Sequence, residues 1–222
     1  MSAASSGIKP QSTQADKAGP SWWVRILITA VALGVWFGAQ ALIGSRGMRN
    51  SGIGDSLLDW TAPANHYLFT HPRAANALLI GSSGIIDALG LLLLGKWIFR
   101  GKLRPFAALV ITLLLREATQ GLVALPAPEG LIWHYPGFPS LFVTYGVAND
   151  FFFSGHTAIA VLGAAELART RNPWIMVLAT FIVIFEVGTV ICLRAHYSMD
   201  VFTGAVTALF AAHLASRLFP DR

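Results

Sequence analysis

Two short stretches of the chain carry residues whose types and spacing suit chemistry at a phosphorus atom. Arg194, His196 and Asp200 lie within seven residues, directly before the last apolar segment. A carboxylate four residues after a histidine shares its helix face, where it holds the imidazole in one tautomer and raises its nucleophilicity. A second histidine, His156, stands 40 residues upstream at the start of another apolar segment. The pattern predicts two imidazoles and one carboxylate in a shared pocket.

Each of these side chains has a candidate role. His196, oriented by Asp200, is the candidate nucleophile, and His156 is the candidate general acid for the leaving oxygen. The Ser154–Gly155 pair allows a tight helix start, whose free N–H groups can bind a phosphoryl oxygen. Arg194 is a candidate cation for the remaining oxygens. The competing interpretation is that the histidines and Arg194 are ordinary side chains of a membrane interface.

The elements that must position these residues are apolar. The chain has 222 residues, of which 55% are hydrophobic and only 12% are charged, against about 25% charged in soluble domains. Length and composition predict one integral membrane domain over residues 21–222, after a disordered cytoplasmic tail over residues 1–20. The basic residues lie mostly in short connections, so the net charge of +5 reflects membrane orientation and not a nucleic-acid partner. The sequence shows no convincing metal-ligand cluster, so neither a metal nor a cofactor is expected.

Six apolar segments predict an all-α, polytopic protein with six transmembrane helices. The first is long enough, at 1.5 Å per residue, to cross a hydrocarbon core of roughly 30 Å. The connection over residues 45–73 is mixed in polarity, and that over residues 126–150 is rich in Pro and Gly. The predicted spans are Trp22–Ile43, Ala74–Leu94, Phe106–Leu125, Phe151–Ala168, Trp174–Leu193 and Met199–Leu218.

The distribution of basic residues predicts the orientation. Eleven Lys and Arg residues fall at the termini and in the connections on their side of the membrane, against four on the opposite side. The positive-inside rule then places both termini in the cytoplasm. His156 and the Arg194–Asp200 stretch lie together at the lumenal or exoplasmic face, in an endomembrane or a bacterial inner membrane.

The same stretches resemble a known family. Ser154-Gly155-His156-Thr157 and His196-Tyr197-x-x-Asp200-Val201 are similar to the second and third motifs of the type 2 phosphatidic acid phosphatase superfamily. The aromatic run from Asp150 to His156 resembles the sphingomyelin-synthase branch, which includes the plant phosphatidylcholine:diacylglycerol cholinephosphotransferases. So does Arg116, followed shortly by Leu125-Pro126-Ala127-Pro128. The resemblance covers about residues 113–218.

One departure separates the chain from the phosphatases. The first phosphatase motif is a Lys, six residues and then Arg-Pro. The nearest string here, Lys96 to Arg104-Pro105, is one residue too long and falls on the cytoplasmic side. The absence of the first phosphatase motif argues against a plain phosphatase and agrees with the sphingomyelin-synthase branch.

The resemblance implies a six-helix bundle like that of the superfamily and a two-step transfer of a lipid headgroup without a metal. His196 attacks the phosphorus of a phospholipid, and His156 protonates the departing diacylglycerol oxygen. A lipid alcohol, either diacylglycerol or ceramide, then attacks the phosphocholine–histidine intermediate with His156 as base.

Further candidates surround this centre. Arg116 and Glu117 lie inside the third predicted span, where charged residues are costly and usually line a cavity. Arg116 is the candidate phosphate ligand, and Glu117 and Tyr197 are further candidates for substrate binding. Asp150 either contributes to the site or only caps the fourth span. The aromatic residues Phe151, Phe152, Phe153, Trp133 and Tyr135 form either a cage for a choline ammonium or an interfacial belt.

Two other functions stay open at this point. One is a lipid phosphate phosphatase acting on phosphatidic acid or a prenyl diphosphate, with water as acceptor. The other is a membrane protein that binds lipid without catalysis. The expected partners are phospholipid, a diacylglycerol- or ceramide-type lipid and the membrane, and the sequence leaves a homo-oligomer open. The headgroup, the acceptor and the roles of Asp87, Glu117 and Glu186 are not fixed by the sequence.

Overall fold

A computed structural model describes residues 53–123, 125–143, 145 and 151–220, together with eight isolated positions between residues 23 and 38. The chain divides into two units, Met1–Gly52 and Ile53–Arg222, and the fold below is that of the second. The first predicted span therefore lies mostly outside the described residues, and the predicted tail over residues 1–20 and Asp150 lie wholly outside them.

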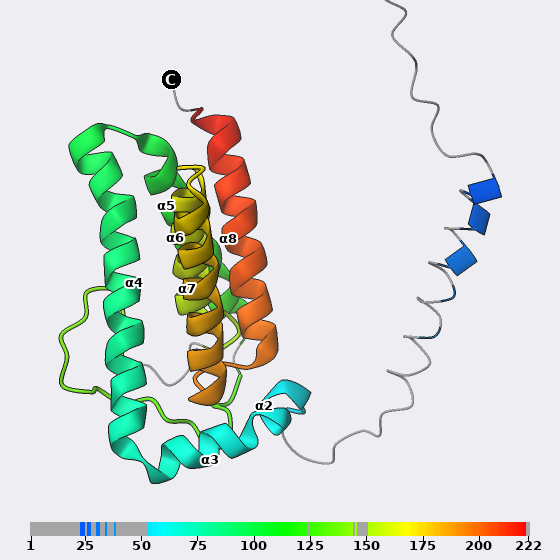
Figure 1. Cartoon of the computed structure of the whole chain (residues 1–222), viewed down its shortest axis with the longest axis vertical. Coiled ribbons are helices and arrows are strands. Elements are labelled where there is room, and N and C mark those ends of the chain that lie inside the picture. The colour runs from blue at the N-terminus through cyan, green and yellow to red at the C-terminus, as the bar shows by residue number, and fades with distance from the viewer. Residues whose placement is uncertain are drawn as a thin grey trace, which may run out of the picture. The chain divides into compact units, whose positions relative to one another are not determined.

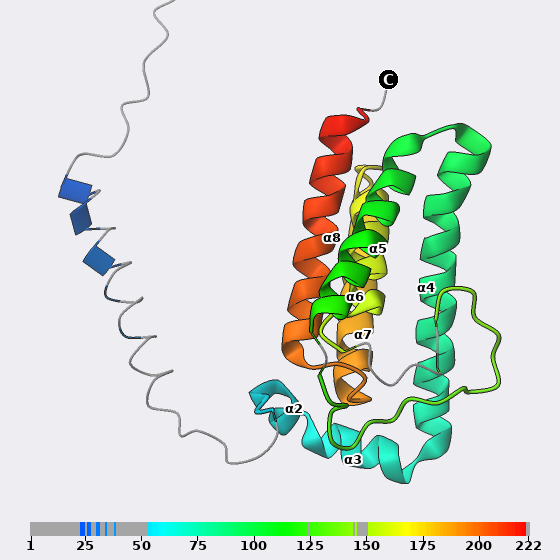
Figure 2. The ribbon, with the colours of Figure 1, turned by 180° about the vertical axis from the view of Figure 1, so that it is seen from behind.

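Helices alone build the described part of the second unit, as Figures 1 and 2 show from opposite sides. Two short helices precede five longer ones, and the residues described here form no strand. The predicted all-α class is confirmed. The helices are α2 (Ser56–Trp60), α3 (Ala62–Thr70), α4 (Pro72–Arg100), α5 (Leu103–Leu122), α6 (Gly155–Ala168), α7 (Pro173–Cys192) and α8 (Ser198–Leu218).

Local capping signals set the ends of the longer helices. The Ser154 Oγ starts α6 by accepting a hydrogen bond from the Thr157 N–H at 3.3 Å. Asn172 caps α7 by accepting from the Trp174 N–H at 2.9 Å, and Asn and Ser are favoured at this position. Gly101 ends α4 in the left-handed region with φ of 61°, a conformation that strains a glycine little. Helices α5 to α8 thus match the predicted spans to within four residues at each end.

The connection before α4 contains two helices that the hydrophobic pattern does not reveal. Helix α2 begins at Asp55, whose carboxylate accepts hydrogen bonds from the N–H groups of Leu57 and Leu58 at 3.0 and 3.3 Å. Helix α3 mixes polar and apolar side chains around its circumference, so it carries no apolar stripe. In Figure 1 both helices run across the lower ends of the long helices. Contacts with α7 and α4 hold them there.

Three of the described helices are long and apolar enough to cross a membrane: α4, α7 and α8. Helix α6 is apolar but has only 14 residues, which reach about 21 Å at 1.5 Å per residue. Helix α5 carries Arg104, Arg116 and Glu117 within its 20 residues. The fold fits an integral membrane protein, and six spans remain a prediction.

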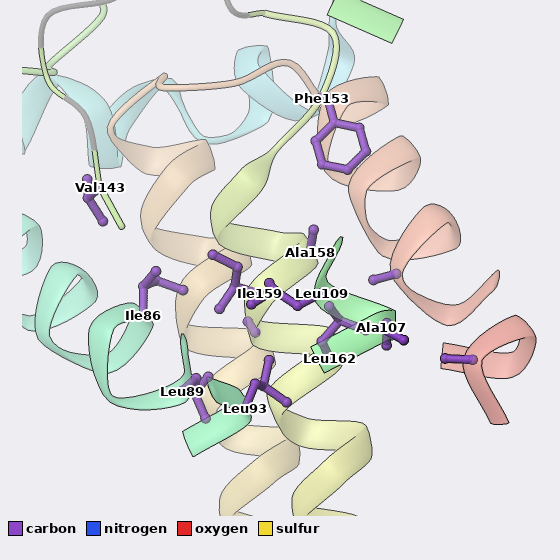
Figure 3. Packing of buried hydrophobic residues seen from close by; sticks show 14 residues of the cluster. Ile86, Leu89, Leu93, Ala107, Leu109, Val143, Phe153, Ala158, Ile159 and Leu162 are labelled. Atoms are coloured by element: carbon purple, nitrogen blue, oxygen red, sulfur yellow. The ribbon is translucent and has the colours of Figure 1, made fainter. Parts of the chain in front are cut away.

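Helix α6 lies at the centre of the bundle and contacts α4, α5, α7 and α8. Figure 3 shows its side chains Ala158, Ile159 and Leu162 among those of α4 and α5. Helix α8 contributes a stripe of small buried residues, which allows helix backbones to approach closely. The stripe consists of Gly204, Ala208, Ala211 and Ala215.

At the end of the bundle where α6 ends, three charged side chains join the helices: Arg104 and Glu166 are buried, and Lys96 is partly exposed. The Nζ of Lys96 and the guanidinium of Arg104 bind the two carboxylate oxygens of Glu166 at 2.7 and 2.6 Å. Buried charges are tolerated when they are paired in this way. The group links the end of α4, the start of α5 and the end of α6, so α5 and α6 run antiparallel.

Candidate active site

The first turn of α8 fixes one of the two histidines. The Asp200 Oδ2 accepts a hydrogen bond from the Tyr197 N–H at 2.9 Å and lies 3.3 Å from the His196 Nδ1. Asp200 is fully buried, and His196 is 8% exposed. An imidazole whose Nδ1 donates to a carboxylate presents the lone pair of its Nε2. Asp200 therefore caps the helix and orients the imidazole with the same oxygen.

The second histidine stands in the first turn of α6. Ser154 is fully buried, and its Oγ accepts hydrogen bonds from both the N–H and the hydroxyl of Thr157. His156 is 8% exposed, and its Nε2 is buried without a hydrogen-bond partner among the described residues. Since a buried ring nitrogen without a partner is costly, this nitrogen is suited to contact a substrate.

The two histidine segments are joined through their backbones. The Ser154 N–H donates a hydrogen bond to the Asp200 carbonyl at 3.0 Å. Gly204, one turn further along α8, faces the same point: a Cβ built on it would lie 2.5 Å from the Ser154 carbonyl oxygen. Only glycine allows this approach. The starts of α6 and α8 thus form one unit.

We expect Gly204→Ala to push these two segments apart, because the neighbouring atom belongs to backbone and cannot rotate away. Overpacking of this kind costs about 1–3 kcal/mol, which should lower the thermal midpoint of the purified protein by several degrees. The matched control is Gly84→Ala in α4, where a Cβ would meet nothing within 4 Å. Equal thermal midpoints for the two variants would contradict the close approach.

A cavity of about 150 Å³ lies beside both histidines. His156 meets Trp133 edge-on with ring centroids 5.2 Å apart, and His196 meets Phe151 at 6.2 Å. The structure therefore brings the two predicted catalytic histidines to one cavity. Residues from α4, α5, α6, the α5–α6 connection and the α7–α8 turn line it: Ile86, Thr112, Leu113, Arg116, Leu131, Trp133, Phe142, Val143, Phe151, Phe153, Gly155, His156, Ala158, Ile159, Ala195 and His196.

Arg116 is the cation of this cavity among the described residues. A Cβ built on Gly155 would lie 3.7 Å from the Arg116 Nε, so the guanidinium sits beside the start of α6. The Arg116 Nη1 also binds the Glu117 Oε1 at 2.6 Å, and the Glu117 side chain is 67% exposed. Arg116 is placed to bind an anion next to both histidines, while Glu117 stands outside the cavity lining.

Other predicted site residues do not line the cavity. The guanidinium of Arg194 donates to the carbonyls of Glu129 and Leu58 at 2.7 and 3.2 Å, an arrangement that supports the α7–α8 turn. The Tyr197 hydroxyl donates to the Pro126 carbonyl at 3.1 Å. Ser154 does not line the cavity either, and its Oγ caps the first turn of α6.

Asp55 and Asn65, two polar residues to which the sequence assigned no role, hold the surroundings of the site. Asp55 accepts a hydrogen bond from the Ser198 N–H at 2.6 Å, next to the His196 turn. Asn65 donates to the carbonyls of Gly130 and Cys192 at 3.1 and 2.9 Å. These partners lie 65 to 143 positions away along the chain, so the sequence alone does not reveal them.

Asp87, in the middle of α4, holds the cavity wall formed by the α5–α6 connection. Its carboxylate accepts hydrogen bonds from the Ser140 hydroxyl at 2.9 Å and from the N–H groups of Leu141 and Phe142 at 3.0 Å. Gly90 lies under the Phe142 ring, where a Cβ would come within 2.5 Å of the ring carbons. Asp87 therefore anchors the α5–α6 connection.

The string that most nearly matches the first phosphatase motif lies far from the cavity. Lys96 and Arg104 both bind Glu166 near the C-terminal end of α6, whereas His156 lies at the N-terminal end of that helix. Neither basic residue lines the cavity. Within the described ranges, no three His, Cys, Asp or Glu side chains form a group that could hold a metal ion.

The fold and the cavity together define a class: a helical, membrane-associated protein with an internal polar site at the starts of two of its helices. The chain belongs to the AtPDCT1/2 family, a family of phosphatidylcholine:diacylglycerol cholinephosphotransferase-like proteins, which it matches over residues 55–217. No curated protein and no solved structure matches the chain.

This family match confirms the predicted resemblance to the cholinephosphotransferases. It begins at Asp55, well upstream of the residues 113–218 on which the resemblance was based, so it includes α2, α3 and α4. The family fits a choline phosphotransferase acting on phosphatidylcholine and diacylglycerol. Placement in the wider phosphatase superfamily stays a prediction.

Proposed function

We propose that the protein transfers phosphocholine from phosphatidylcholine to the hydroxyl of a second lipid, diacylglycerol, through a covalent intermediate on His196. The observation that carries the proposal is the shared cavity: two buried histidines line it, and a buried carboxylate lies behind one of them. The family match supports the same substrates.

In the first step, the Nε2 of His196 attacks the phosphorus of phosphatidylcholine. The N–P bond forms as the bond from phosphorus to the diacylglycerol oxygen breaks, and that oxygen takes a proton from His156. Asp200 stabilises the charge that develops on the His196 imidazole. Arg116 and the free N–H groups at the start of α6 hold the non-bridging phosphoryl oxygens.

In the second step, the hydroxyl of the incoming diacylglycerol gives its proton to the Nε2 of His156. Its oxygen then attacks phosphorus as the N–P bond breaks, and His196 returns to its starting state. Protons balance over the cycle, because His156 loses one in the first step and gains one in the second. The new phosphatidylcholine carries the acyl chains of the acceptor.

The size of the cavity fits a site that encloses only part of a lipid. Its volume of about 150 Å³ is below the roughly 300–1,000 Å³ of pockets that enclose drug-sized ligands. It therefore suits the polar part of a lipid, the headgroup with the adjoining glycerol esters, and the acyl chains extend out of it. Trp133, Phe151 and Phe153 line it and supply ring faces and edges near a choline ammonium. By the distribution of basic residues, the site opens on the non-cytoplasmic face.

The direct experiment uses the full-length protein in vesicles of phosphatidylcholine labelled in the choline group. Diacylglycerol with distinguishable acyl chains is added or withheld. Labelled phosphatidylcholine carrying the acceptor's chains should appear only with the acceptor. Water-soluble labelled phosphocholine in either condition would favour hydrolysis. The absence of any labelled product would contradict the proposal that the protein is an enzyme acting on phosphatidylcholine. Ceramide in place of diacylglycerol tests the alternative acceptor.

Asp55 gives a graded prediction for this activity. Its two oxygens serve the α2 N-cap and the Ser198 N–H, whereas an asparagine has one acceptor oxygen and can serve only one of them. Asp55→Ala should lower the transfer rate about fivefold, because a contact of about 1 kcal/mol no longer holds Ser198 beside the His196 turn. Asp55→Asn should lower it about twofold. Initial rates and thermal midpoints check this. Wild-type rates for the alanine variant would show that the contact with Ser198 does not position His196.

A further inference from the structure

The cavity has a deeper part that the mechanism does not use. Thr112 precedes Arg116 by four residues in α5 and lies on the same face of the helix, about 6 Å further along the axis. Both residues line the cavity. Because α5 and α6 run antiparallel, Thr112 lies on the level of residues beyond the first turn of α6. The lining also includes the apolar residues Ile86, Val143 and Ile159.

The hydroxyl of Thr112 differs from those of two other helical threonines, Thr119 and Thr180. Thr112 is 1% exposed, and its Oγ1 has no hydrogen-bond partner among the described residues. A threonine inside a helix normally donates to a carbonyl one turn earlier. Thr119 in the same helix does so to the Leu115 carbonyl at 3.0 Å, and Thr180 does so to Met176 at 3.0 Å. Of these three threonines, Thr112 borders the cavity, and its hydroxyl is buried without an acceptor among the described residues.

A buried hydroxyl without a partner destabilises a fold, so its position needs a reason. A ligand that fills the cavity can supply the acceptor. On the proposed function the phosphorus lies between His196, His156 and Arg116. In a glycerolipid, the polar groups nearest the phosphate on the acyl side are the ester carbonyls, a few bonds away. The spacing of one helical turn between Arg116 and Thr112 suits that arrangement.

We propose that the Thr112 hydroxyl donates a hydrogen bond to an ester carbonyl of the bound glycerolipid, so that the site selects ester-linked lipids. The proposal rests on the proposed function, because it takes the position of the phosphorus from it. Donor phosphatidylcholine and acceptor diacylglycerol both carry such esters. An ether-linked lipid has the same chain length and no carbonyl at this point, and it is the matched probe.

The test measures transfer with each combination of diester and diether donor and acceptor, for the wild-type protein and for Thr112→Val. Valine has the shape of threonine without the hydroxyl. Wild type should lose about tenfold in kcat/KM when the relevant ester becomes an ether, as expected for one hydrogen bond of about 1.4 kcal/mol. Thr112→Val should lose about as much with the diester lipid and should no longer distinguish it from the diether. The combination that shows the loss identifies donor or acceptor.

Two control variants separate the hydrogen bond from the shape of the cavity. Thr112→Ser keeps the hydroxyl and should retain the preference for esters. Thr119→Val removes a hydroxyl that is already bonded within the helix, so the preference should stay as in wild type. The inference is overturned if wild type treats diester and diether lipids alike, or if Thr112→Val keeps the discrimination.

A binding measurement keeps the two proposals distinguishable. Short-chain diester phosphatidylcholine should raise the thermal midpoint of wild type more than the diether analogue does, because a ligand stabilises the state that binds it. The difference should vanish in Thr112→Val. Binding that distinguishes the esters without any transfer would reject the proposed function alone. Transfer without such discrimination would reject the role of Thr112 alone, and the absence of both binding and transfer would reject both.

Discussion

His196→Ala is expected to abolish headgroup transfer and to remove the covalent intermediate, while the protein stays folded. The imidazole is the proposed nucleophile, and no other ring nitrogen can replace it at the same place. The fold should survive because the Asp200 Oδ2 keeps its hydrogen bond from the Tyr197 N–H, so the start of α8 retains its cap. Transfer from labelled phosphatidylcholine and acid-labile label on the quenched protein are the two measurements.

The matched control is His213→Ala, which makes the same change on an exposed position of the same helix. This variant should transfer at the wild-type rate and carry the label. Transfer above a few per cent of wild type by His196→Ala would count against the nucleophile. Label on the His196→Ala variant would place the covalent bond on another side chain.

Asp200→Asn should fold like wild type and lose about 10²–10⁴-fold in kcat, in line with other carboxylates that orient a catalytic histidine. One acceptor oxygen remains on the amide, and it can keep the bond from the Tyr197 N–H that starts α8. The negative charge beside His196 is lost, so the imidazole is neither held in its tautomer nor stabilised when it becomes charged. Initial rates at saturating substrate and thermal midpoints test both parts.

Asp200→Ala separates the two tasks of this side chain. It removes the cap as well as the charge, so it should lower the thermal midpoint in addition to the rate. Asparagine and alanine variants with equal midpoints would show that the cap contributes little. Normal turnover by Asp200→Asn would remove Asp200 from the mechanism.

Much of the bundle could be predicted because its helices end at signals that act locally. Pro72 and Pro173 begin helices, Ser154 and Asn172 cap them, and Gly101 ends one. Helices α2 and α3 could not be predicted in the same way. They lie across the ends of the long helices, where neither a long apolar run nor an apolar stripe is required.

The candidate catalytic residues could be predicted from the sequence, but the residues that support the cavity wall or could contact the lipid could not. His196 and Asp200 are only four residues apart, so their contact is local, but the predicted shared helix face is wrong. His196 lies before the N-cap Tyr197 of α8, and the capping bond from the Tyr197 N–H to Asp200 brings the two side chains together. Asp87 contacts residues more than fifty positions away, and Asp55 contacts Ser198 across 143 positions. Hydrophobic periodicity carries no information about such pairs. Thr112 gives no signal either, because threonine is common in apolar helices.

The junction of α6 and α8 limits how substrate preference can be changed by design. Ser154 and Asp200 share a hydrogen bond, and Gly204 leaves no room beside them. A substitution on this side of the cavity will therefore disturb reactivity and folding together. The facing wall depends on other supports, since Asp87 holds Phe142 and α5 carries Thr112. Libraries that aim at new headgroups or acceptors should vary that wall and leave the junction unchanged.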